Sequence, residues 1–94
     1  MPHVSKRKLD GETFNQIFDN LIGVLVRAQK QKRFEQILHE LLTETEKTML
    51  AKRLAIVLML CGSTPQHRIS EALLVSPSTV TRMSFGVETG KYNL

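Results

Sequence analysis

The 94-residue chain lacks the cysteine pairs, clustered ligand residues and long apolar runs that disulfides, metal centres and membrane spans need. Its one cysteine, Cys61, excludes an intramolecular disulfide and fits a reducing compartment. Because Cys61 ends the apolar run 54–61, we interpret it as a core residue rather than a nucleophile. That run is too short to cross a bilayer, and the polar start of the chain does not resemble a signal peptide. We therefore expect a cytoplasmic protein that does not bind membranes.

Residue patterns that carry catalysis or hold metals are also missing. The three histidines are scattered, with no cysteine or carboxylate at ligand spacing, so we expect no metal site. The chain has no glycine-rich phosphate loop, no nucleophile elbow and no paired catalytic carboxylates. We interpret Glu44 and Glu46 as residues that stabilise the start of a helix rather than as catalytic carboxylates. We therefore expect that the protein is not an enzyme.

The chain has fewer acidic than basic residues. The chain has 13 Lys and Arg against 9 Asp and Glu, a net charge of +4 and a pI near 9.6. This balance favours nucleic acid as a partner, although an ordinary basic domain has the same balance. Residues 1–9 contain Lys6, Arg7 and Lys8, and we interpret them as a flexible basic arm, either simply solvated or contacting phosphates. Residues 10–94 are predicted to form a single domain.

Apolar residues recur at helical spacing along most of the chain, which predicts an all-α fold. Asp10 or Gly11 opens a first helix, whose apolar stripe runs from residue 14 to residue 25. The polar segment 27–33 ends or bends this helix, and residues 34–42 form a second one.

A third and longest helix is predicted over residues 43–61. It is opened by a capping box, Thr43-Glu44-Thr45-Glu46, in which Thr and Glu satisfy each other's backbone amides. After Arg53 this helix is apolar nearly all round, and a chain of this size can scarcely cover it alone. We therefore expect a symmetric homodimer. Gly62 is predicted to end the helix at the C′ position.

Two short helices around a tight turn are predicted next, at about residues 65–84. Ser63 or Thr64 would cap the first of them, with Pro65 at its first position. Ser76 would cap the second, which continues from Pro77.

This spacing is typical of a DNA-binding helix-turn-helix, whose second helix enters the major groove. Leu74 departs from the pattern, because many such motifs carry glycine at the left-handed turn residue. A plain helical hairpin that binds a protein partner is the alternative. If the motif binds double-stranded DNA, small hydroxyl side chains can approach base edges and arginines can contact phosphates. The candidate DNA-binding residues are Arg68, Ser76, Pro77, Ser78, Thr79, Thr81 and Arg82.

Three segments, residues 41–46, 53–57 and 79–82, resemble the Trp repressor family. The resemblance covers about residues 34–84, and the tail 86–94 is similar to that of the YerC/YecD-type branch. It implies a Trp-repressor-like helical bundle that forms an intertwined homodimer. It also implies a transcription regulator, most simply a repressor, that presents two recognition helices to successive major grooves of an operator.

The resemblance also implies a ligand pocket. Leu42, Thr43, Arg53 and Arg82 occupy positions that hold L-tryptophan in the family. However, Met83 replaces a glycine beside the second arginine, and a serine that helps to bind the amino group is replaced by a glycine at 86. The sequence leaves open whether L-tryptophan, another small effector or no ligand binds there.

Overall fold

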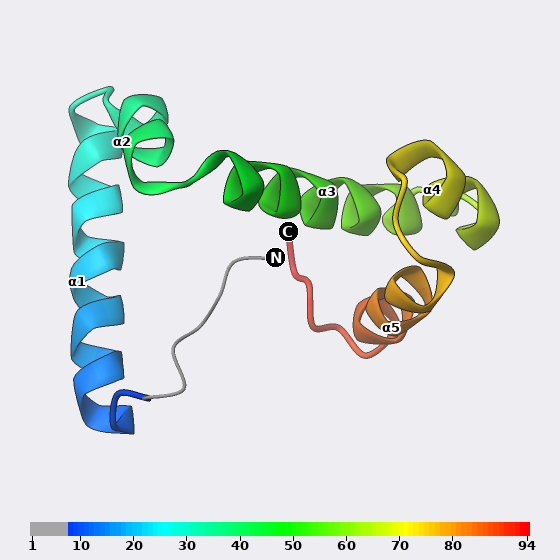
Figure 1. The fold of residues 1–94 in the computed structure, drawn as a ribbon, viewed down its shortest axis with the longest axis horizontal. Helices are drawn as coiled ribbons and strands as arrows, with labels where there is room; N and C mark the ends of the chain where they lie inside the picture. The colour runs from blue at the N-terminus through cyan, green and yellow to red at the C-terminus, as the bar shows by residue number, and fades with distance from the viewer. Residues whose placement is uncertain (1–7) are drawn as a thin grey trace. The chain divides into compact units, whose positions relative to one another are not determined.

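The structure, a computed structural model, describes residues 8–94 (Figure 1). The described residues contain helices and no strand, so the all-α prediction is confirmed. The helices are α1 (Gly11–Lys30), α2 (Phe34–Leu41), α3 (Glu44–Cys61), α4 (Gln66–Leu73) and α5 (Pro77–Glu88).

The chain divides into two compact units, Met1–Lys47 (unit 1) and Thr48–Leu94 (unit 2), and each is described by itself. Most of the predicted basic arm lies outside the described residues. Of the arm, Lys8 and Leu9 are described, and both are exposed.

In unit 1, local hydrogen bonds set the ends of α1. The Asp10 carboxylate caps the helix by accepting the Thr13 amide at 2.7 Å, and this hydrogen bond lowers the pKa of the carboxyl. At the other end, Lys32 is left-handed (φ 58°) and the Arg33 amide donates to the carbonyl of Ala28 at 2.7 Å. These bonds turn the chain, so that α2 packs beside the end of α1 with Ala28 buried (Figure 1). The predicted break over 27–33 is confirmed.

The apolar stripe of α1 is not covered within unit 1. Phe14, Ile17, Phe18 and Ile22 are each 45–52% exposed, although the Phe14 and Phe18 rings stack at 5.9 Å. Ala28 is the buried residue of this unit among the described residues. An amphipathic helix with this much apolar surface in water needs another surface to cover it.

The predicted capping box opens α3. The Thr43 amide donates to Glu46 Oε1 at 2.9 Å, and the Glu46 amide donates to Thr43 Oγ1 at 3.1 Å.

The end of α3 differs from the prediction. The left-handed C′ residue is Ser63 (φ 63°) and not Gly62. The Thr64 amide donates to the carbonyl of Met59 at 2.9 Å, and the Ser63 amide to that of Leu60 at 3.0 Å. This is the Schellman arrangement, and it places C′ two residues after Cys61.

The start of α4 also differs. Pro65 is its N-cap, without a side-chain hydrogen bond, and the helix begins at Gln66. The predicted cap by Ser63 or Thr64 is wrong. Both residues belong to the turn that ends α3, and the next residue, Pro65, is the N-cap of α4.

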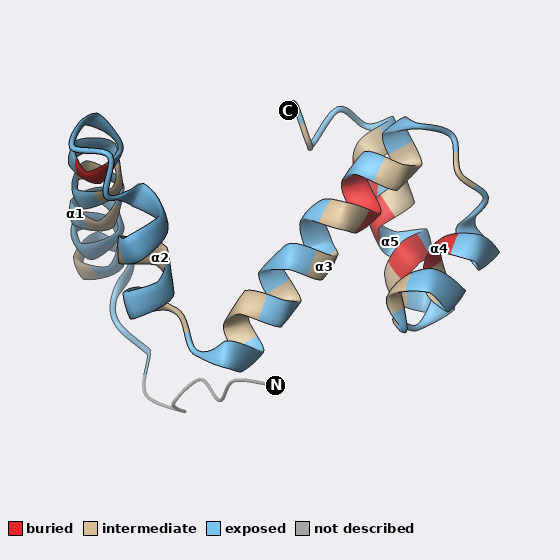
Figure 2. Cartoon of the chain, turned by 90° about the horizontal axis from the view of Figure 1, so that it is seen from above, coloured by how far each residue is buried: buried red, intermediate tan, exposed pale blue. Residues whose placement is uncertain are grey.

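Three helices of unit 2 share one core. It consists of Ile56 and Val57 from α3, Ile69 from α4, and Val80 and Met83 from α5 (Figure 2). All five side chains are at most 9% exposed. Burying such side chains provides about 1.5–3 kcal/mol each.

A neighbouring side of α3 is exposed. Leu50, Leu54 and Leu58 follow one another at intervals of four residues and are 48–55% exposed. Cys61 continues the same face three residues after Leu58, and it is exposed too. The interpretation of Cys61 as a core residue is therefore wrong for this chain.

The predicted helix pair with a tight turn is present as α4 and α5. Leu74 is left-handed (φ 55°, ψ 49°), and the Val75 amide donates to the carbonyl of Ser70 at 3.2 Å. Ser76 then caps α5 by accepting the Thr79 amide at 3.2 Å, and Pro77 occupies the first helical turn, both as predicted.

Replacing Leu74 by glycine is expected to stabilise the protein. A left-handed conformation costs a non-glycine residue about 1–2 kcal/mol, and glycine loses about 0.5–1 kcal/mol more chain entropy on folding. Leu74 is 83% exposed, so few contacts are lost. Leu74→Gly should therefore raise the free energy of unfolding by about 0.5 kcal/mol, measured by urea titration at fixed protein concentration.

Gly90→Ala is the matched control for this substitution, because Gly90 also has a positive φ (81°) with open space around its Cα. It should lower the urea midpoint. A lower midpoint for Leu74→Gly would mean that the exposed leucine makes contacts that outweigh its strain.

Candidate nucleic-acid interface

Helix α5 has one buried side and one exposed side, whose residues up to Arg82 are polar. Val80 and Met83 pack in the core of unit 2 and fix the orientation of the helix. Ser78, Thr81 and Arg82 are exposed and, at helical spacing, share the opposite side. We call these three residues the outer face of α5. Because two short hydroxyl side chains stand beside one arginine, the helix backbone can approach another surface closely there.

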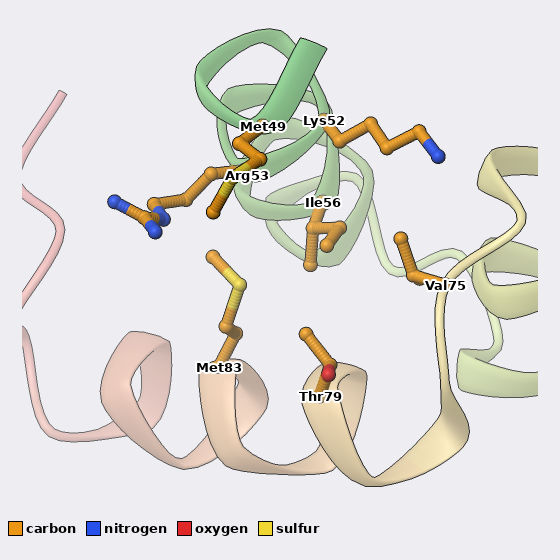
Figure 3. A pocket seen from close by; sticks show the side chains of 7 residues that line it. All are labelled: Met49, Lys52, Arg53, Ile56, Val75, Thr79 and Met83. Atoms are coloured by element: carbon orange, nitrogen blue, oxygen red, sulfur yellow. The ribbon is translucent and has the colours of Figure 1, made fainter. Parts of the chain in front are cut away.

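The first turn of α5 is held by hydroxyl groups. Ser76 Oγ lies 2.7 Å from Thr79 Oγ1 and 3.2 Å from Ser78 Oγ, in addition to capping the Thr79 amide. Thr79 is half-buried and its side chain points toward α3 rather than outward (Figure 3). Among the predicted residues here, Pro77 and Ser78 are thus exposed, whereas Thr79 supports the turn.

A hydrogen bond joins the outer face of α5 to α4. Thr81 Oγ1 lies 3.0 Å from Gln66 Oε1 and 3.0 Å from the carbonyl of Pro77, and its single proton serves one of them at a time. The sequence prediction did not include Gln66. No local pattern marks it, since it lies 15 residues from Thr81 and the turn brings the two together. Its exposed amide adds a donor and an acceptor next to the outer face.

Most of the net positive charge belongs to unit 2. Residues 48–94 contain five Lys and Arg against two Glu. Arg68 on α4 and Arg82 on α5 are both exposed, and neither forms an ion pair with another residue in the described part of the chain. Arginines with unpaired guanidinium groups next to a polar helix face suit a polyanionic partner.

A hollow of about 160 Å³ lies between α3 and α5 (Figure 3). Met83 projects into it from α5 toward Met49, and Arg53 extends past them from α3. We call it the α3–α5 hollow. It is lined by Met49, Lys52, Arg53, Ile56, Val75, Thr79 and Met83.

The four residues predicted to form a ligand pocket belong to different units and have different surroundings. Arg53 lines the α3–α5 hollow, whereas Arg82 is exposed and is not among the lining residues. Leu42 and Thr43 belong to unit 1, where Leu42 follows α2 and Thr43 takes part in the capping box.

No group of three or more His, Cys, Asp or Glu side chains within residues 8–94 could hold a metal ion. No helix in this range is long and apolar enough to span a bilayer.

Comparison with known proteins assigns the chain to a family. The family model described as "Trp repressor protein" matches residues 16–93, which include all of α2 to α5 and most of α1. No curated protein and no solved structure matched the chain in the same comparisons. Assignment to the YerC/YecD-type branch stays a prediction. Because the match covers most of the chain, the chain belongs to the Trp repressor family, whose members are DNA-binding transcription regulators and not enzymes.

Proposed function

We propose that the protein is a sequence-specific transcription repressor that binds operator DNA as a homodimer, with α5 as the recognition helix. The observation that carries this proposal is the outer face of α5, with Ser78, Thr81 and Arg82 presented by a helix that the core fixes from the other side. A recognition helix needs this combination of a rigid buried side and short exposed polar side chains.

The predicted DNA-binding residues take two roles in this proposal. Pro77, Ser78 and Thr81 approach base edges or nearby phosphates, and Arg68 and Arg82 contact the phosphate backbone. Ser76 and Thr79 hold the first turn of α5 in place. Because hydroxyl groups distinguish bases less strictly than Arg or Asn, DNA shape and bridging water contribute to the specificity.

The uncovered apolar surfaces support a homodimer. The α1 stripe of unit 1 and the Leu50–Leu58 side of α3 in unit 2 are each about half exposed. Two chains that intertwine cover these surfaces mutually, and residues 10–94 then work as one domain. The dimer presents two recognition helices to successive major grooves, about 34 Å apart. We place this regulator in the cytoplasm.

We further propose that DNA binding does not need L-tryptophan. Met83 is 9% exposed and fills part of the space between α3 and α5. The remaining hollow of about 160 Å³ is close to the roughly 150 Å³ that accommodates benzene. It is below the roughly 300 Å³ at which pockets for larger ligands begin. A smaller effector that contacts Arg53 is compatible with this space.

A protein-interaction module on the transcription machinery is the second candidate function. Phe85 on α5 is 69% exposed and Leu74 in the turn is 83% exposed. Exposed apolar side chains of this kind favour a protein partner. This candidate would be favoured if the protein retarded no DNA duplex in a gel at low salt but formed a stable complex with RNA polymerase.

Arg82→Ala is expected to weaken DNA binding. The loss of one phosphate contact should reduce affinity several-fold and lower the slope of log K against log[salt] by about 1. The duplex would first be selected from a random pool by the wild-type protein, and affinities then measured between low and physiological salt.

Two control variants make the Arg82 measurement specific. Arg82→Lys keeps the charge and should keep most of the salt slope. Lys30→Ala removes an exposed charge at the end of α1 and should leave both quantities unchanged. Wild-type affinity and slope for Arg82→Ala would remove this residue from the interface.

Wild-type protein is expected to give no heat with L-tryptophan at millimolar concentration in a calorimetric titration. Met83→Ala enlarges the α3–α5 hollow and should create measurable binding of indole. It also costs about 2–5 kcal/mol of stability, so it is measured at low temperature with helix content checked. Met83→Leu keeps the volume and should give no heat. Heat from the wild-type protein would contradict tryptophan independence.

A further inference from the structure

The C-terminal tail, residues 90–94, turns back from the end of α5 toward the core of unit 2 (Figure 1). Gly90 is left-handed (φ 81°), and the Lys91 amide donates to the carbonyl of Gly86 at 2.9 Å. The Thr89 hydroxyl donates to the same carbonyl at 3.0 Å. Both bonds hold the start of the tail against the last turn of α5.

Tyr92 lies on Gly86. A Cβ atom at position 86 would be 2.9 Å from Tyr92 Cε2, closer than side chains approach in proteins. The ring is half-buried and packs against the core, and the ammonium of Lys91 lies 5.4 Å from the centre of the ring. Gly86 is therefore the position at which α5 lets the tail come close.

The tail also contacts α3. Tyr92 and Leu94 line a second hollow, of about 160 Å³, together with residues of α3. Those α3 residues are Leu50, Arg53, Leu54 and Val57. The Tyr92 side chain thus touches α5 on one side and α3 on the other.

This contact complements the core at the other end of α5. Val80 and Met83 fix the first two turns of α5 against α3 and α4. In the last turns Phe85 is exposed, and the partly buried Val87 packs against the core. The helix is 12 residues, or about 18 Å, long. Without Tyr92, Val87 is left to hold the last turns of α5 against the core, so we expect the direction of the helix to be less firmly fixed.

We propose that Tyr92 is a positioning residue for the DNA-binding helix: its ring, seated on Gly86 and against α3, fixes the direction in which α5 presents Ser78, Thr81 and Arg82. This inference rests on the proposed function of α5. The apolar ring makes these contacts, since the Tyr92 hydroxyl has no hydrogen-bond partner among the described residues.

Tyr92→Ala tests the positioning role on DNA. If the correctly oriented α5 falls to about one tenth of the population, the apparent Kd for the selected duplex rises about tenfold. Binding to an unrelated duplex and the salt slope stay at wild-type values, because Arg68 and Arg82 are unchanged. Tyr92→Phe should restore specific binding to within about twofold, and Asn93→Ala, an exposed neighbour, should have no effect. Equal specific affinity for Tyr92→Ala and wild type, both folded, would overturn the proposal.

Gly86→Ala gives a second test. Alanine favours helix over glycine, so α5 itself should not be weakened, yet the new methyl group displaces the ring. Specific affinity should fall about tenfold in the wild-type background and should not fall further in the Tyr92→Ala background. Gly23→Ala in α1, where the nearest atom is an ordinary 3.8 Å away, is the matched control. Independent, additive losses for the two substitutions would contradict the proposed contact.

Docking of the tail can be measured without DNA. Tyr92 is the only tyrosine and the chain has no tryptophan, so intrinsic fluorescence reports on this ring alone. Acrylamide should quench it more strongly in Gly86→Ala than in wild type or Gly23→Ala. Equal quenching in Gly86→Ala and wild type would contradict the contact between the Tyr92 ring and Gly86. If wild-type protein retards no duplex, the proposed function and the positioning role both fail. If it binds and Tyr92→Ala binds equally well, only the positioning role fails.

Discussion

The structure of unit 2 depends on one constraint: the side of α5 that carries Val80 and Met83 must be buried. Val80 and Met83 bury that side against Ile56 and Ile69. When Val80 and Met83 are buried in the core, the rotation of α5 about its own axis is fixed. The short polar side chains of Ser78 and Thr81 then face outward. The features that resemble a DNA-reading surface are therefore a consequence of where the apolar residues stand, and the hydroxyl groups themselves need not hold the helix.

The same reasoning supports the proposed homodimer. Five side chains form the core of unit 2, while the Leu50–Leu58 side of α3 and the α1 stripe stay half exposed. A monomer would keep these apolar surfaces in water and lose much of the available hydrophobic stabilisation. Intertwining two chains in the proposed dimer removes both surfaces from water, and it also sets the distance between the two copies of α5.

Local signals in the sequence predicted the elements of the fold well. The caps at Thr43 and Ser76 each act within three residues and are confirmed, and of the two starts predicted for α1 the structure has Asp10 as the cap. The cap predicted at Ser63 or Thr64 is wrong. The sequence also allowed α5 to be placed within a helix-turn-helix pattern.

Contacts between distant residues could not be predicted in this way. The Gln66–Thr81 hydrogen bond and the seat of Tyr92 on Gly86 both depend on how the turns direct the chain. The interpretation of Cys61 as a core residue fails for a related reason: an apolar run does not reveal which side of a helix is covered. Arg53 lines both hollows: Met83 lines the one between α3 and α5, and Tyr92 lines the one between α3 and the C-terminal tail. The proposed positioning role connects the two departures from the family pattern at 83 and 86. In it, the Met83 side chain and the Tyr92 ring on Gly86 hold α5 against α3 with groups of the chain itself.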